Sequence, residues 1–225
     1  MTQTHHKRAR PPAKKPAQKS AKSASSSRAP FVIIAAAVVI AFVIAIVATR
    51  NSGSTDSNLA QTSAVTVAGS SLPQLSDSAP DPAIGLAAPE LRGAAFDGSP
   101  VGIVNDGRPK IVIFIAHWCP HCQAEVPVIT KWLAANGKPS GVDMYAVSTG
   151  VSKDQPNYPP SAWLKRENWP LTTLADSADA VAAQAFGLSA YPFFTVVNTR
   201  GKVVLRATGE LDTTKLAQLV TLAES

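Results

Sequence analysis

The chain contains two cysteines, Cys119 and Cys122, within the stretch FIAHWCPHCQAEVP. Two thiols at this spacing can form a structural disulfide, bind a soft metal ion, or alternate between dithiol and disulfide while exchanging electrons with a substrate. Each use requires different surroundings, so the neighbouring residues and the compartment decide among them.

A purely structural disulfide is the least favoured of the three uses. The bond would close a loop of only a few residues, and a cross-link removes least entropy from the unfolded chain when its loop is short. Such a bridge would stabilise the fold little. A reactive pair explains the spacing of Cys119 and Cys122 better.

A metal site is the second alternative, because His117, Cys119, His121 and Cys122 could supply ligands for copper or zinc. Structural zinc sites normally take a second pair of ligands from elsewhere, but the chain has no other cysteine and no later histidine. Gln123 follows the second cysteine, so this is not the Cys-x-x-Cys-His motif of covalent haem attachment. We predict no metal and no other cofactor, and keep a membrane-anchored copper-binding module as an alternative.

A redox dithiol fits the local sequence best. A buried strand is expected to end at Ala116, which places Cys119 at the N-terminus of the next helix. Unpaired backbone N–H groups and the helix dipole favour a thiolate there. His121 adds positive charge when it is protonated, and Cys122 lies one turn deeper. We therefore expect Cys119 to be the nucleophile and Cys122 the resolving thiol.

The segments around the dithiol predict one mixed α/β domain. A turn at Asp97-Gly98 predicts a hairpin, and β-branched or apolar runs predict the remaining strands at 110–116, 142–149, 171–175 and 193–209. Amphipathic runs predict helices at 122–135, 161–168, 177–187 and 212–224. Strands that alternate with helices in this order indicate a mixed sheet with helices on both faces.

The sequence before the domain divides into three regions. Residues 1–30 hold eight of the 21 basic residues and no acidic residue, which predicts a disordered tail. Residues 31–49 contain 18 consecutive apolar residues and are long enough to cross a bilayer; the alternative, a cleaved signal peptide, would have a shorter apolar region. Residues 50–88, rich in Ser, Thr, Ala and Pro, predict a flexible linker to a domain at 89–225.

The distribution of basic residues predicts the orientation of this single span. Only Arg50 follows the span closely, so we expect the N-terminus in the cytoplasm and the domain on the outer side of the cytoplasmic membrane. Disulfides can persist in such a compartment. The basic tail would contact the headgroups of the lipid bilayer, and we expect no nucleic-acid partner.

The segment around the cysteines resembles the active site of the thioredoxin superfamily. Trp118 precedes the first cysteine, and Pro127 stands five residues after the second. Tyr191-Pro192, ahead of the closing hairpin, matches the family's cis-proline element. The resemblance covers residues 89–225 and implies a thioredoxin-like fold with an N-terminal hairpin. It also implies that Trp118, Tyr191 and Pro192 contact the substrate.

Two groups of this superfamily share features with the chain. The anchor, the hairpin and the CQAEVP stretch resemble the membrane-anchored, extracytoplasmic TlpA/ResA-like group, whereas Pro120-His121 is the dipeptide of DsbA-like oxidases. Ile113 stands where thioredoxin has a buried aspartate. Glu125 is then the nearest proton relay for the second cysteine, with a solvated helix residue as the alternative, and we expect His117 to be exposed.

The resemblance implies a membrane-tethered protein thiol–disulfide oxidoreductase. A stabilised Cys119 thiolate makes the disulfide more oxidising. Pro120, His121 and the absence of the aspartate favour such a thiolate. We therefore predict donation of disulfides to secreted or membrane proteins. The alternative is a reductase for cytochrome c maturation or other extracytoplasmic thiols. Either role needs protein thiols or disulfides as substrates and a membrane redox partner, a quinone-linked oxidase or an electron-transferring reductase.

Overall fold

The computed structural model describes residues 59–76 and 80–224. The predicted tail at 1–30 and the predicted transmembrane segment at 31–49 lie outside these residues. Within the described part of the chain, no helix combines the length and the apolar character needed to cross a membrane.

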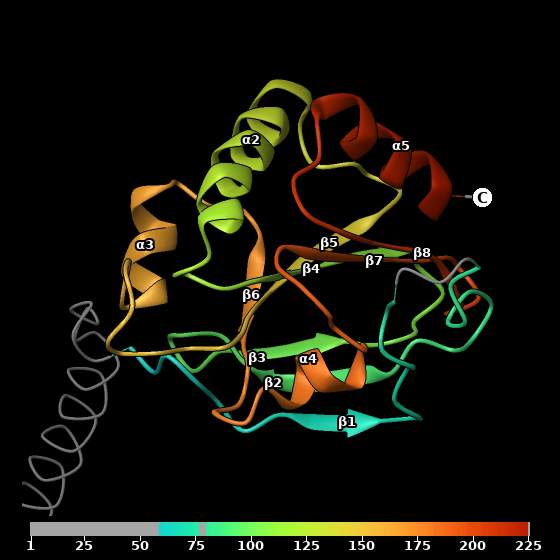
Figure 1. Cartoon of the computed structure of the whole chain (residues 1–225). Helices are drawn as coiled ribbons and strands as arrows, with labels where there is room; N and C mark the ends of the chain where they lie inside the picture. Colours follow the sequence, from blue (N-terminus) through green and yellow to red (C-terminus); the bar gives the residue numbers. More distant parts are fainter. Residues whose placement is uncertain (1–58, 77–79, 225) are drawn as a thin grey trace, which may run out of the picture. The chain divides into compact units, whose positions relative to one another are not determined.

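One mixed sheet forms the centre of the domain (Figure 1). Its strands are β1 (Thr66–Ala68), β2 (Glu90–Ala94), β3 (Pro100–Ile103), β4 (Lys110–Ile115), β5 (Asp143–Ser148), β6 (Thr172–Ala175), β7 (Phe193–Val197) and β8 (Val203–Thr208). Their order is β1-β2-β6-β5-β4-β7-β8, with β3 paired to β2. β5 runs parallel to both β4 and β6, whereas β7 runs antiparallel to β4 and β8.

In the described part of the chain, four helices pack around this sheet: α2 (Pro120–Asn136), α3 (Pro160–Arg166), α4 (Val181–Ala185) and α5 (Thr213–Ala223). Figure 1 shows α2 and α5 on one side of the central strands and α4 on the other. Ile113 of β4 packs in the apolar core that includes α2, α3 and α5, whereas Phe114 packs in the core that includes α4. This alternation confirms the predicted mixed sheet with helices on both faces, and it explains why β4 reads as one continuous apolar run.

The segment before β2 belongs to the folded domain, so the expectation of a flexible linker over 50–88 is wrong from residue 59 onward. We call residues 59–76 and 80–88 the strap. β1 lies within it and pairs with β2, and the Leu72 N–H donates to the Ala185 carbonyl at 2.8 Å. The polar composition was misleading, because a segment whose backbone groups are paired needs only a few buried side chains, here Leu72 and Ala83.

A buried ion pair fastens the strap to β8. The Arg206 guanidinium donates to both oxygens of the Asp81 carboxylate, at 2.9 and 2.5 Å. It also donates to the carbonyls of Pro73 and Phe186. The Arg206 side chain is fully buried, and its hydrogen bonds hold the pKa of Asp81 below its usual value. The Arg206 side chain therefore joins the strap, strand β8 and the end of helix α4.

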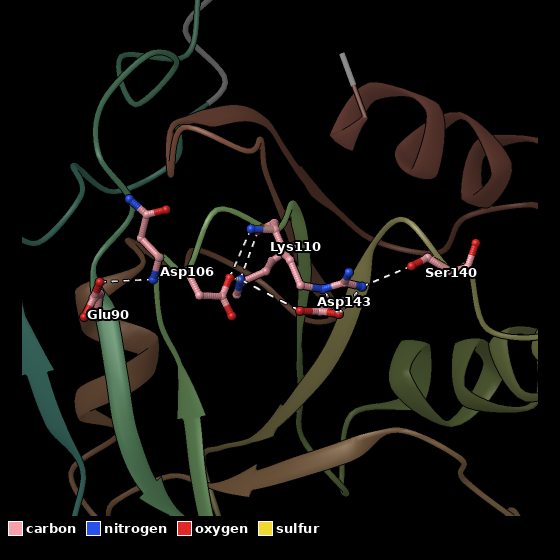
Figure 2. A network of polar contacts seen from close by, with 7 residues as sticks. Glu90, Asp106, Lys110, Ser140 and Asp143 are labelled. Atoms are coloured by element: carbon pink, nitrogen blue, oxygen red, sulfur yellow. Dashed lines mark hydrogen bonds and ion pairs between the residues drawn. The ribbon is translucent and has the colours of Figure 1, made fainter.

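A polar network fixes the starts of the two central parallel strands (Figure 2). Lys110, at the start of β4, is buried and binds the Asp106 carboxylate and the Arg108 carbonyl. The Arg108 side chain donates to Asp143, at the start of β5, and to the Ser140 carbonyl. The network ties the turn before β4 to β5, at the opposite end of β4 from the cysteines.

Removing the charge of Asp81 is expected to destabilise the domain. The Asp81→Asn change leaves a buried guanidinium without an anion, and losing one partner of a buried ion pair costs about 3 kcal/mol or more. Urea unfolding of the full-length chain, followed by tryptophan fluorescence, measures this loss. The control is Asp154→Asn at an exposed position, which should change the free energy of unfolding by at most about 0.5 kcal/mol. Equal effects of the two changes would contradict the role of the pair.

Candidate dithiol active site

Strand β4 and helix α2 place the two cysteines at one end of the sheet. Cys119 is the N-cap residue of α2, with extended backbone angles of φ −73° and ψ 122°, and Pro120 occupies the first turn. Proline suits this position because its missing N–H would have had no partner inside the helix. Cys119 therefore lies where the unpaired N–H groups and the dipole of α2 favour an anion.

The outer cysteine faces the Tyr191-Pro192 element. The Cys119 Sγ lies 3.7 Å from the Tyr191 carbonyl oxygen, and the Tyr191 ring packs edge-on against Trp118 at 5.6 Å between centroids. The Tyr191-Pro192 bond is cis, which confirms the expectation for Pro192. A second cis bond joins Tyr158 to Pro159, and nothing in the sequence indicated it. The structure thus brings four predicted site residues together.

The two thiols differ in access, and the inner thiol is affected by its burial. They are not bonded to each other in this structure. Cys119 exposes 6% of its surface, whereas Cys122 exposes none. Burial raises the pKa of the Cys122 thiol, although the Ala116 N–H, 3.5 Å from its sulfur, opposes the shift. Only Cys119 is accessible to a substrate sulfur.

Glu125 is buried beneath the dithiol, so the alternative of a solvated helix residue is wrong. It is 1% exposed, and α2 places it on the same face as Cys122 and Val126. One carboxylate oxygen accepts the Leu211 N–H at 2.9 Å, and the other has no partner. Burial raises the pKa of Glu125 to about 7. The helical spacing from Cys122 was the sequence signal for this position.

His121 forms a surface contact that the sequence did not predict. Its Nδ1 lies 2.8 Å from a carboxylate oxygen of Glu210, which precedes α5. The two side chains are 66% and 50% exposed, so solvent and salt screen the pair and it contributes at most about 1 kcal/mol. Glu210 follows His121 by 89 positions, and no local pattern connects them.

His117 is buried, so the expectation that it is exposed is wrong. Its ring lies against the segment between β5 and α3: Nδ1 is 2.6 Å from the Pro156 carbonyl oxygen, and Nε2 is 3.2 Å from the Ser152 nitrogen. Burial lowers the pKa of His117. The signal available in the sequence was its place directly after a strand that is buried on both faces.

The two histidines considered as metal ligands have other partners. His117 contacts Pro156 and Ser152, and His121 contacts Glu210. Across residues 59–76 and 80–224, no group of three or more His, Cys, Asp or Glu side chains is arranged to hold a metal ion.

The fold and the dithiol define a thioredoxin-fold protein with a Cys-x-x-Cys site at the end of β4. The sequence model of the Redoxin family matches residues 68–222, and the chain belongs to that family. The match begins within the strap, in agreement with its place in the folded domain.

Individual relatives are more distant. The chain is 34% identical over 86 residues to the soluble secreted antigen MPT53 of Mycobacterium tuberculosis, covering 36% of this chain and 47% of that protein. It is 28% identical over 142 residues to the methylamine utilization protein MauD of Paracoccus denitrificans, covering 62% and 64%. The chain thus spans less than two thirds of either curated relative.

A solved structure is consistent with the fold. The thiol:disulfide interchange protein of the thioredoxin family from Chlorobium tepidum superposes with a TM-score of 0.51 at 20% identity, covering 62% of this chain and 96% of that one. At this identity the likeness concerns the fold alone.

Replacing Glu125 by Gln is expected to stabilise the protein at high pH. The folded-state pKa of about 7 exceeds the unfolded value near 4.5, so the native state holds more protons between these values. Stability therefore falls as the pH rises through this window. Above it, the charged form costs on the order of 3 kcal/mol. Glutamine can still accept the Leu211 N–H.

Urea unfolding at pH 5 and pH 8 measures this effect. Wild type and Glu125→Gln should have similar stability at pH 5, and the variant should be the more stable by about 1–3 kcal/mol at pH 8. Glu224→Gln changes an exposed carboxylate and should follow the wild type at both values. If the stability of Glu125→Gln kept the full pH dependence of the wild type, the pKa of the Glu125 carboxyl would not be raised and the prediction would be wrong.

Proposed function

We propose that this protein is a thiol–disulfide oxidoreductase that acts on other proteins through Cys119 and Cys122. One observation carries the proposal: Cys119 caps α2 and faces the Tyr191 carbonyl, whereas Cys122 has no exposed surface. A pair in which only one sulfur is accessible suits thiol–disulfide exchange. The outer sulfur forms the bond to the substrate, and the inner sulfur resolves the mixed disulfide. Membership of the Redoxin family supports this assignment.

The exchange proceeds through a mixed disulfide. In the donor direction, a substrate thiolate attacks Cys119 Sγ of the oxidised pair, and the S–S bond to Cys122 breaks. A second substrate thiolate then attacks the substrate sulfur of the mixed disulfide and releases Cys119 as a thiolate. Two electrons pass to the pair, and one disulfide forms in the substrate. The reductase direction is the same sequence reversed.

Glu125 holds the proton that this cycle moves. Burial raises the pKa of Cys122, and the charge of Glu125 adds to that shift. The departing Cys122 thiolate therefore takes up a proton readily, and the neutral Glu125 carboxyl can donate it. In the reverse direction the Glu125 carboxylate removes the proton from Cys122. A carboxyl whose pKa is about 7 can serve both directions near neutral pH.

The substrate segment binds along the Tyr191-Pro192 element. Tyr191 directs its carbonyl to Cys119 and precedes strand β7, so an extended peptide can pair with its backbone. Main-chain pairing depends little on side chains, which suits an enzyme with many protein substrates. Trp118 bounds the same surface and packs on the Tyr191 ring.

Donation of disulfides is the direction we propose. Cys119 is the N-cap residue of α2, a position where helix dipoles in general favour an anion, and Ile113 is fully buried where thioredoxin carries an aspartate. A stabilised thiolate makes the disulfide more oxidising. The His121–Glu210 contact favours the alternative, a reductase for cytochrome c maturation or other extracytoplasmic thiols, because the Glu210 carboxylate offsets any positive charge on the His121 ring.

We also propose that the protein works outside the cytoplasmic membrane, anchored by residues 31–49. The apolar run and the basic residues before it support this placement. Continued turnover then needs a membrane redox partner, a quinone-linked oxidase for the donor or an electron-transferring protein for the reductase.

Single cysteine substitutions test the division of roles. With substrate proteins that contain a disulfide, Cys122→Ser should accumulate mixed disulfides, because the Cys119 thiolate attacks the substrate disulfide and the thiol that would release the substrate is missing. Cys119→Ser should form none, because the buried sulfur is out of reach. Non-reducing electrophoresis after acid quenching measures the adducts, and a Thr214→Ser variant at an exposed position is the control. Adducts formed by Cys119→Ser as readily as by Cys122→Ser would contradict the assignment.

The reduction potential of the pair decides its direction. Equilibration with glutathione buffers should place it above about −200 mV for a donor, whereas a value at or below about −250 mV would assign the reductase role.

Glu210→Gln should make the potential more oxidising by at most about 20 mV, which corresponds to an exposed ion pair. When His121 is also replaced by Ala, Glu210→Gln should leave the reduction potential unchanged. A change in the potential of that double variant would show that Glu210 acts independently of His121.

A further inference from the structure

The segment from Gly150 to Tyr158, which we call the β5–α3 loop, is attached to the residues directly before Cys119. The Trp118 Nε1–H donates to the Gly150 carbonyl at 2.7 Å. The His117 ring contacts the loop at Ser152 and at Pro156. Two consecutive residues of the dithiol segment therefore hold both halves of the loop.

The contacts of His117 define its tautomer. The Ser152 backbone N–H can only donate, so the His117 Nε2 accepts and carries no proton. The Pro156 carbonyl can only accept, so Nδ1 carries the proton and donates to it. A neutral imidazole satisfies both groups, and a second proton would abolish the bond to Ser152. Burial, which lowers the pKa of His117, favours the same neutral form.

Few other contacts hold the loop in place. Four consecutive loop residues, Lys153 to Pro156, are exposed. The Tyr158 ring packs against the His117 ring at 6.0 Å between centroids, and the Asn157 side chain approaches the His117 carbonyl at 3.4 Å. Arg166 donates to the Asn157 side chain at 2.9 Å. Most of the contacts that hold this loop nevertheless involve His117.

The loop forms most of an open pocket beside the dithiol. The pocket has a volume of about 270 Å³ and is lined by Trp118, Gly150, Ser152 and Gln155. None of these residues carries a charge. Gly150 has φ +60°, and a Cβ there would lie 2.9 Å from the Tyr191 hydroxyl oxygen, so the pocket wall also abuts the residue whose carbonyl faces Cys119.

We propose that His117 is a positioning residue for substrate recognition, holding the β5–α3 loop so that this pocket accepts an uncharged side chain next to the substrate cysteine. The inference rests on the proposed function and adds a side-chain preference to the main-chain pairing at Tyr191. A substrate whose cysteine reaches Cys119 passes Trp118, and its neighbouring side chain then lies against Trp118 and Gln155. A charged side chain would lose hydration there without gaining a partner.

The test compares full-length variants on dithiol peptides with Leu, Gln, Lys or Glu beside the first cysteine, and on dithiothreitol as a substrate without side chains. Oxidised glutathione restores the Cys119–Cys122 disulfide after each turnover. For the wild type we expect KM to be about fivefold lower for the Leu and Gln peptides than for the Lys and Glu peptides, roughly the effect of one net hydrogen bond. His117→Ala should remove this preference through KM rather than kcat. His117→Gln, whose amide oxygen can accept the Ser152 N–H, should restore part of it.

Two further variants test the proposal even if His117→Ala does not fold. Gln155→Lys adds a charge at the exposed rim and should shift the preference about fivefold toward the Glu peptide. Lys153→Ala, in the same loop and outside the pocket, should match the wild type on every substrate. Peptide preferences that are equal in the wild type, His117→Ala and Gln155→Lys would overturn the positioning role while leaving the proposed function in place. Failure of the wild type to exchange electrons with dithiothreitol would overturn the proposed function itself.

Discussion

All six residues of β4 are buried, with alternate side chains packed in the two cores of the domain. A strand held on both faces cannot shift without exposing apolar surface on one of them. Its end therefore defines a rigid starting point for the turn that leads into α2. Cys119 occupies the helix cap beyond that turn, and Cys122 follows one helical turn later inside the core. The asymmetry of the dithiol is thus a consequence of how β4 is buried.

The same burial creates a conflict between stability and chemistry. Glu125 is an acidic group within an apolar environment, and one of its oxygens has no partner. An amide or an apolar residue would stabilise the fold better at neutral pH. In the proposed cycle, this carboxyl group exchanges a proton with the buried Cys122. A position at which a protein departs from the usual packing rules is commonly part of a functional site. Glu125 is such a position, and it lies beneath the dithiol.

Long-range contacts complete the site. The strap is fastened to β8 by Arg206 and Asp81 and pairs with β2, so it supports the face of the sheet that carries α4. Around the dithiol itself, His117 contacts the β5–α3 loop, and Glu210 contacts His121. The chemistry of the two sulfurs is local, whereas their access and their electrostatic surroundings depend on segments that are distant in the chain.

The sequence alone determined the order of strands and helices around the dithiol and the place of Cys119 at a helix start, because each rests on a pattern of neighbouring residues. The cis-proline element at Pro192 was implied by the resemblance to the thioredoxin superfamily. It did not determine that the strap is folded, that Glu125 and His117 are buried, or that Glu210 contacts His121. Those features arise from contacts between residues as far apart as Asp81 and Arg206. Burial and ion pairing are properties of the packed chain, and only the tertiary structure decides which polar side chains lose their water.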